Sequence, residues 1–177
     1  MKFEAKHVLS VTLEEMEASW EDERYFPFLL KHCSAVQALH VLEAHWQNNC
    51  LLRRVRCLPK PVIRTIGPKA VNPHWFSFVS HTTYHFETKV LYFANEPDNP
   101  QVRSVFSNQG EIRFSPLGNQ TECMATGDIS LGLPKRLRFL APLGEFLIRR
   151  EGLNMLSGEI PVMERFVQEV LRAPSAL

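Results

Sequence analysis

The stretch from Leu133 to Leu171 carries a long apolar helical pattern, which limits the possible folds more than any other feature of the sequence. Apolar residues at 162–171 recur at helical spacing with polar residues between them, as is typical of a helix with one buried stripe. The pattern begins upstream, at 139–148. Gly158 and Pro161 interrupt it, so the sequence allows one long helix, kinked near these residues, or two helices end to end. Either arrangement needs a large apolar partner.

Alternation of apolar and polar residues predicts β-strands through most of the preceding chain. Thr12 and Glu15 fit a capping box that starts a helix, and a second short helix is expected at 22–32. The prolines of 59–78 indicate an irregular segment, in which 62–66 could form one helical turn. We therefore expect an α+β fold in which a curved antiparallel sheet of about six to seven strands wraps around the C-terminal helix. The predicted strands cover 2–11, 35–47, 50–58, 79–94, 102–114 and 121–131, with a turn at Asn48-Asn49 and a bulge at 108–110.

Length and composition are consistent with one globular domain that spans 1–177. A net charge of +1 gives no reason to expect a nucleic-acid partner. The N-terminus lacks the apolar core of a signal peptide, and no apolar run is long enough to cross a membrane. The four cysteines match no zinc-ligand spacing. We therefore expect a cytoplasmic protein with reduced thiols.

Two longer stretches resemble a known superfamily. The opening MKFEAKHVLSVTLEEMEASW looks like a first strand and capped helix, and the ending TGDISLGLPKRLRFLAPLGEFLIRREG looks like a last strand entering the long helix. On these stretches and the order of elements, nearly the whole chain resembles the START-like superfamily. This superfamily, also called SRPBCC or helix-grip proteins, includes the birch-pollen allergens and polyketide cyclase-like proteins. The chain is most similar to a bacterial branch. The resemblance implies a cavity between sheet and helix for an apolar or amphipathic molecule.

His7, His40 and Arg54 are the polar candidates for a ligand site. Each histidine shares the more apolar face of its strand. Each is either a partly buried residue with a satisfied hydrogen bond or a polar group that orients a ligand in the cavity. Arg54 stands between Arg53 and Arg56, and adjacent residues of a strand point to opposite faces. These arginines either pair with neighbouring acids or bind a carboxylate or phosphate.

Metal and acid–base motifs find little support. His81 and His85 would lie about 13 Å apart on a strand, too far to share one ion. Asp128 shares its strand parity with residues that should face solvent, which favours a surface position. The sequence contains no nucleophile elbow, phosphate-binding glycine loop or dinucleotide fingerprint. We therefore predict no catalytic residue, metal or cofactor.

The aromatic residues are too numerous to lie all on the surface, so most belong to the core and some are expected to line the cavity. The segment 59–78 is a candidate cavity mouth, although a plain structural connection is an equal alternative. The predicted aromatic ligand contacts are Trp46, Trp75, Phe76, Phe93, Phe139 and Phe146.

Three functions remain open at this stage. The first is binding of a lipid, fatty acid or polyketide-like molecule for transport or sensing. The second is a cyclase-, aromatase- or hydrolase-type enzyme that uses His7 or His40 as its acid–base group. The third is a structural or partner-binding protein with a collapsed cavity. The basic residues 135–138 and 149–150 indicate a solvated face or, alternatively, a transient membrane-surface contact.

Overall fold

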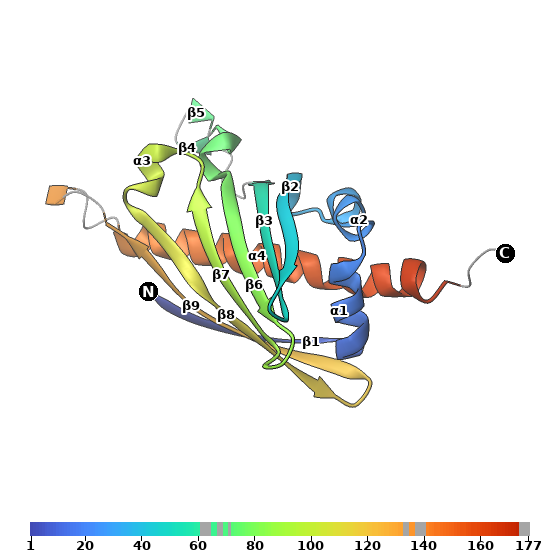
Figure 1. Cartoon of the computed structure of the whole chain (residues 1–177). Helices are drawn as coiled ribbons and strands as arrows, with labels where there is room; N and C mark the ends of the chain where they lie inside the picture. The colour runs from blue at the N-terminus through green and yellow to red at the C-terminus, as the bar shows by residue number, and fades with distance from the viewer. Residues whose placement is uncertain (61–64, 67–68, 71, 133–134, 137–140, 174–177) are drawn as a thin grey trace.

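The computed structural model describes the backbone of residues 1–60, 65–66, 69–70, 72–132, 135–136 and 141–173 (Figure 1). Its centre is a curved seven-stranded antiparallel sheet with the strand order β1-β9-β8-β7-β6-β3-β2. Consecutive strands pair as hairpins from β6 to β9, and β1 returns to pair with β9. The strands are β1 (Lys2–Leu9), β2 (Val36–Gln47), β3 (Cys50–Pro59), β6 (Phe78–His85), β7 (Val90–Pro97), β8 (Phe106–Leu117) and β9 (Gln120–Leu131). A small separate ladder joins β4 (Thr65–Ile66) to β5 (Lys69–Ala70).

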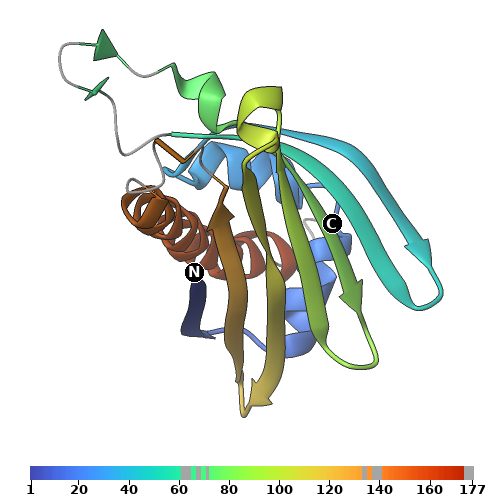
Figure 2. The ribbon, with the colours of Figure 1, turned by 90° about the vertical axis from the view of Figure 1, so that its left-hand side faces the viewer.

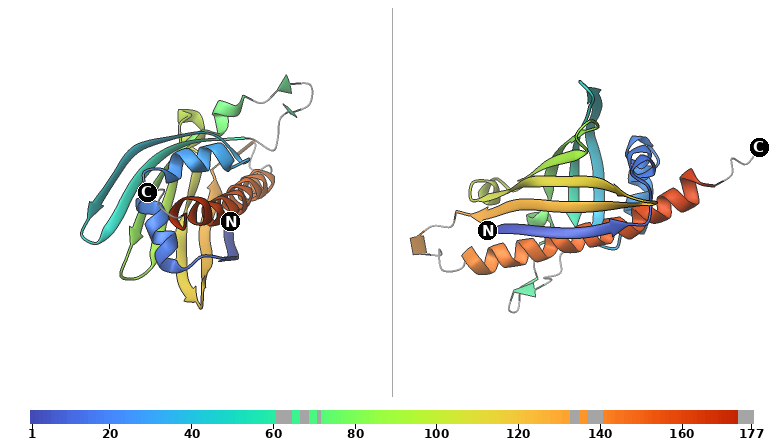
Figure 3. Two further views of the ribbon diagram at one scale, coloured as in Figure 1. Left: turned by 90° about the vertical axis from the view of Figure 1, so that its right-hand side faces the viewer. Right: turned by 90° about the horizontal axis from the view of Figure 1, so that it is seen from below.

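The long helix α4 (Ala141–Phe166) is continuous across Gly158 and Pro161 and ends in a π-helical segment, Val167–Leu171. One long helix is therefore the correct alternative. It lies on the same side of the sheet as α1 (Leu13–Glu21) and α2 (Tyr25–His32) (Figure 2). Seen from below, α4 runs alongside β1 (Figure 3). The remaining helices are the short α3 (Pro100–Arg103) and the 3₁₀ turn η1 (Pro73–Phe76). Among the described residues, no helix is long and apolar enough to cross a membrane.

The predicted capping box at the start of α1 is confirmed. The Glu15 backbone N–H donates to the Thr12 hydroxyl over 3.3 Å, and the Thr12 N–H donates to the Glu15 carboxylate over 3.0 Å. Arg172 also donates to both Glu15 oxygens, over 2.6 and 2.7 Å. This carboxylate therefore joins the first helix to the residues that follow α4, which closes the α1 end of the molecule.

The core lies where α1, α2 and the last part of α4 meet the sheet. Trp20 packs edge-on against Tyr84 and Phe114, with ring centroids 4.9 and 5.3 Å apart. Tyr25 packs in the same way on Phe166, at 5.4 Å. These rings are almost fully buried, and aromatic pairs of this geometry add about 1 kcal/mol each beyond their buried area.

Of three local expectations, one is confirmed and one is wrong, and the third falls mostly outside the described residues. β8 pairs with both neighbours in unbroken register, so the bulge predicted at 108–110 is wrong. Bulges lie in β2 instead, between Val36 and Ala38 and between Val41 and Glu43. The turn at Asn48-Asn49 is confirmed, since both residues have positive φ angles (48° and 62°). The helical turn predicted at 62–66 falls mostly outside the described residues, and 65–66 form β4.

Candidate functional site

The inner face of the sheet is the one that contacts α1, α2 and α4, and the outer face is the opposite one. Leu9, Tyr84 and Phe114 are inner-face residues that join the core. Paired residues form one continuous row across the middle of this face, which we call the central row. It consists of Ala44, Arg53, Thr82, Phe93, Gly110, Gly127 and Phe3.

The core covers the inner face unevenly. Tyr84 and Phe114, next to α1, are almost completely buried, whereas Phe3, Phe93 and Asn108 are only half-buried. The less covered end lies near the start of α4. The Leu131 N–H, at the end of β9, donates to the carboxylate of Glu145 in the first turns of that helix, over 3.3 Å. Accessible apolar and polar side chains therefore adjoin the packed core, as expected of a ligand-binding chamber. We call this less covered part of the inner face the chamber.

Two glycines make room for the aromatic rings of the chamber. A Cβ atom at Gly110 would lie 2.9 Å from the Phe93 ring, and one at Gly127 would lie 2.6 Å from the Phe3 ring. Both distances are shorter than a carbon–carbon contact allows. The absence of side chains at these positions therefore lets both rings lie over the neighbouring strand.

Arg53 is a buried cation in the central row. Its side chain is only 7% exposed and lies over the rings of Trp20 and Phe26, at 5.3 and 5.5 Å from their centroids. Among the described residues, its Nε–H has no hydrogen-bond partner and no carboxylate lies within salt-bridge distance. Burial lowers the pKa of Arg53, although an arginine side chain remains charged at neutral pH. The guanidinium is thus available to an anionic or carbonyl oxygen.

Tyr25 and Glu159 form a polar pair next to this arginine. The Tyr25 hydroxyl donates to the Glu159 carboxylate over 3.1 Å. Burial raises the pKa of Glu159, while the Tyr25 hydrogen bond and the charge of Arg53 act in the opposite direction. Burial and the nearby carboxylate raise the pKa of Tyr25 well above its usual value. Glu159 can therefore hold a proton under conditions in which an exposed glutamate is ionised.

Three further inner-face atoms are buried without a partner among the described residues: His7 Nε2, Asn95 Oδ1 and Asn108 Oδ1. Such atoms are rare in folded proteins, and each indicates a missing water, ion or ligand. Asn95 and Asn108 pair across β7 and β8, one inner-face step from Phe93 and Gly110. Unpartnered polar groups therefore accompany the aromatic rings of the chamber.

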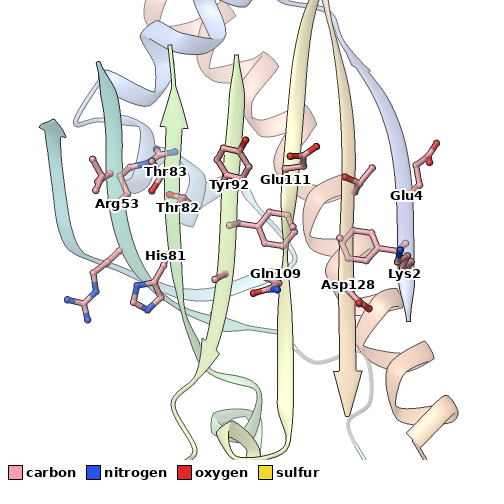
Figure 4. A pocket seen from close by; sticks show the side chains of 18 of the residues that line it. Lys2, Glu4, Arg53, His81, Thr82, Thr83, Tyr92, Gln109, Glu111 and Asp128 are labelled. Carbon is pink, nitrogen blue, oxygen red and sulfur yellow. The ribbon is translucent and has the colours of Figure 1, made fainter. Parts of the chain in front are cut away.

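A cleft of about 1110 Å³ crosses the strands from β2 to β1, and it is lined by outer-face residues and also by Phe3, Arg53 and Phe93 of the central row (Figure 4). Thr83, Tyr92 and Glu111 form part of one wall, and His81, Gln109 and Asp128 form part of the other. Most of its charged groups are paired, for example Arg113 with Glu111 at 2.8 Å and the N-terminal amine with Asp128 at 3.0 Å. The cleft and the chamber therefore share residues of the central row.

Solved structures show the same architecture. An aromatase/cyclase, Zhui, from a Streptomyces species has a TM-score of 0.63 at 12% identity and covers 96% of both chains. Norcoclaurine synthase from Thalictrum flavum has a TM-score of 0.62 at 9% identity, covering 96% of this chain and 87% of its own. A Thermus thermophilus protein has a TM-score of 0.62 at 17% identity, covering 92% and 97%. This chain has the helix-grip fold. At these identities the likeness establishes the fold alone, and the sequence matches no family model and no curated protein.

The polar residues predicted to contact a ligand lie on different faces of the sheet. His7 lies on the inner face, as expected. His40 is exposed on the outer face, so its predicted inward orientation is wrong. The bulges between Val36 and Ala38 and between Val41 and Glu43 each insert one residue, so the segment between them alternates out of phase with the rest of β2. Arg54 also faces outward, where it pairs with Glu43 at 3.4 Å.

The predicted aromatic contacts do not gather in one place. Phe93 lies in the central row. Trp46 is 51% exposed and stacks on Phe86, with ring centroids 4.5 Å apart, near the β2–β3 turn. Phe76 is half-buried in η1, and Phe146 is 55% exposed on α4. The side chains of Trp75 and Phe139 lie outside the described residues.

Sequence reasoning did not single out Arg53, Tyr25 or Glu159 as site residues. A signal for Glu159 exists, because it shares its helical stripe with Val162, Met163 and Phe166, all of which are buried. An acidic residue within an apolar stripe indicates a buried carboxylate. The inward direction of Arg53 depends only on the phase of β3, which the buried neighbours Leu51 and Val55 define.

Proposed function

We propose that the protein binds an amphipathic small molecule in the chamber between sheet and α4, for transport or sensing in the cytoplasm. The observation that carries this proposal is Arg53, a buried guanidinium whose Nε–H has no partner. A carboxylate or carbonyl oxygen of the ligand would complete its hydrogen bonding. The apolar part of the ligand would then lie against Phe3 and Phe93.

The remaining polar atoms narrow the ligand class. Asn95, Asn108 and His7 can each exchange a hydrogen bond with a hydroxyl or carbonyl group of the ligand. A lipid, fatty acid or polyketide-like molecule with several oxygens on an apolar body fits this distribution better than a plain hydrocarbon does. The known structures support the same class, since one neighbour is an aromatase/cyclase and another was solved with dopamine and hydroxybenzaldehyde.

The first experiment is native mass spectrometry of the protein from its expression host, with extraction and identification of any bound molecule. The second measures binding of a fluorescent fatty acid to the wild type, Arg53→Met and the matched control Arg54→Met. A hydrogen bond to a charged group contributes about 1.5–3 kcal/mol, so Arg53→Met should weaken binding about 10- to 150-fold. Arg54→Met should leave affinity unchanged, because its side chain faces outward. Equal effects of both variants would exclude the chamber as the binding site, and absence of any ligand would favour a structural or partner-binding role.

A second function, proton-transfer catalysis of the cyclase type, is favoured by the Tyr25–Glu159 pair. Glu159, whose pKa is raised by burial, could donate a proton to a substrate oxygen held by Arg53. In this reading Glu159 takes the acid–base role that the sequence suggested for His7 or His40. Glu159→Gln should then abolish turnover of a poly-keto substrate analogue but keep its binding. Unchanged turnover would exclude Glu159 as the acid.

A further inference from the structure

A thiol and an imidazole lie in contact on the outer face, away from the chamber. Cys50 and His85 are directly paired residues of β3 and β6, and their Sγ and Nδ1 atoms are 3.1 Å apart. The His85 ring is itself held edge-on by Tyr92, at 5.5 Å between ring centroids. A nucleophile, a base within hydrogen-bond reach and a third group that orients the base form the arrangement of an activated nucleophile.

Cys50 also differs from the other three cysteines in its accessibility. Cys33, Cys57 and Cys123 are buried, whereas Cys50 is only partly covered. Burial raises the pKa of both Cys57 and Cys123 to about 12, and it also raises that of Cys33. These three thiols are therefore shielded and protonated at neutral pH, which leaves Cys50 as the reactive one.

The outer cleft provides a place for a reactant next to this pair. The cleft is lined by Leu52, Thr83 and Tyr92. Leu52 is two residues from Cys50 on β3, Thr83 is two residues from His85 on β6, and Tyr92 is two residues from Val90 on β7. Side chains two residues apart point to the same face, about 6.6 Å from each other. The thiol thus lies one same-face step from Leu52, which lines the cleft of about 1110 Å³.

We propose that Cys50 and His85 form a reactive-thiol site that exchanges with small disulfides bound at this end of the outer cleft. His85 Nδ1 accepts the proton of the Cys50 thiol, and the thiolate attacks one sulfur of the disulfide. The disulfide bond breaks as the mixed disulfide on Cys50 forms, and the departing thiolate takes the proton from His85. One protein thiol and one small disulfide therefore give one mixed disulfide and one small thiol.

Few other titratable groups surround this pair in the described part of the chain. On β2, His45 pairs with Glu43 at 3.3 Å, and in the β6–β7 turn Glu87 accepts from Asn49 at 3.1 Å. The remaining neighbours are Tyr92 on β7 and, on β8, Arg113 with its partner Glu111. The charged neighbours are thus already bound to other groups, and His85 is the base in contact with the thiol.

The test uses the full-length protein, dithiodipyridine and oxidised glutathione, with the modified residue located by mass spectrometry. One cysteine should react rapidly in the native wild type, and Cys50→Ser should remove this phase. An ordinary thiol is only about 3% ionised at pH 7, so His85→Gln should slow the reaction by up to about 30-fold. The difference should vanish at alkaline pH, where the thiol ionises without a base. His40→Gln is the matched control, since His40 is exposed on β2, does not line the cleft and should leave the reaction as in the wild type.

Several results would overturn the proposal. A rapid phase that survives in Cys50→Ser would assign the reactivity to another thiol. A His85→Gln variant that reacts like wild type at neutral pH, or more slowly at every pH, would show that His85 does not act as a base. If His85→Gln does not fold, the wild-type pH–rate profile decides, because an unassisted thiol would lose its reactivity below pH about 8.

Discussion

Replacing Arg53 with methionine should make the protein more stable. The guanidinium is 7% exposed and no carboxylate of the described residues pairs with it. Taking an ion out of water costs several kcal/mol even after the protein relaxes. The cation–π contacts of Arg53 with the rings of Trp20 and Phe26 stabilise the folded state by about 0.5–2 kcal/mol each. A net penalty of about 1–3 kcal/mol therefore remains, and methionine should remove it while keeping the contacts with both rings.

This change is measurable by urea unfolding and by thermal melting. For a chain of this length, 1–3 kcal/mol corresponds to a rise in Tm of about 3–10 °C. Arg54→Met is the control, because its exposed ion pair with Glu43 should be worth less than about 1 kcal/mol. The outcome that refutes the reasoning is a loss of about 3 kcal/mol in Arg53→Met. Such a loss is typical of breaking a buried ion pair, and it would mean that Arg53 and an ionised Glu159 stabilise each other.

Three further changes probe the pH dependence, the sheet and the first helix. Burial raises the pKa of Glu159 in the folded state. Above the ordinary pKa of a glutamate, the unfolded chain has therefore lost this proton while the folded protein still holds it. The free energy of unfolding should therefore fall as the pH rises from the ordinary pKa of a glutamate to the raised pKa of Glu159. Glu159→Gln should remove this fall, as measured by urea midpoints at several pH values. The same dependence of the midpoints on pH in Glu159→Gln would contradict this prediction. Gly110→Ala would place Cβ 2.1 Å from the Thr126 carbonyl oxygen and should cost about 3 kcal/mol, whereas the control Gly152→Ala, in open space on α4, should gain about 0.5–1 kcal/mol in the same assay. Thr12→Ala removes the cap of α1 and should lower the unfolding free energy by about 1 kcal/mol; no change would show that Arg172 alone holds that helix end.

Local signals in the sequence were sufficient for most of the fold. The capping box at Thr12, the Asn48-Asn49 turn and the alternation of the strands each depend on residues close together in the chain. Interactions of this kind can be read without knowing the tertiary structure.

The bulge in β2 could not be predicted in the same way. From Val36 to Trp46 every second residue is apolar except His40, which is the pattern of an uninterrupted strand. The structure inserts one residue between Val41 and Glu43, and both sides of this point leave large apolar residues, Val41 and Leu42, over 40% exposed. The register of an edge strand depends on its single neighbour, here β3, and this pairing is invisible in the β2 sequence. His40 faces outward because it lies between this bulge and the one between Val36 and Ala38.

The chamber residues escaped prediction because long-range pairing assembles them. Tyr25, Arg53 and Glu159 come from α2, β3 and α4, and no pairwise spacing in the sequence connects them. The strand parity of Arg53 and the helical stripe of Glu159 each show that a charged side chain turns inward. They do not show that both charges meet beside the same tyrosine, which requires the α4 helix to cross the sheet at one particular level.

The distribution of unfavourable groups over the molecule favours a functional rather than a structural role for the chamber. Each buried polar atom without a partner costs about 1–3 kcal/mol, and His7, Arg53, Asn95 and Asn108 all contribute such an atom on the inner face. A fold of ordinary stability, about 5–15 kcal/mol, retains several of these only if other contacts compensate. The aromatic packing beside α1 and the cap of that helix provide this compensation at the opposite end of the sheet. A collapsed cavity would gain stability from apolar residues at these four positions, so their polarity supports the proposal that the chamber binds a ligand.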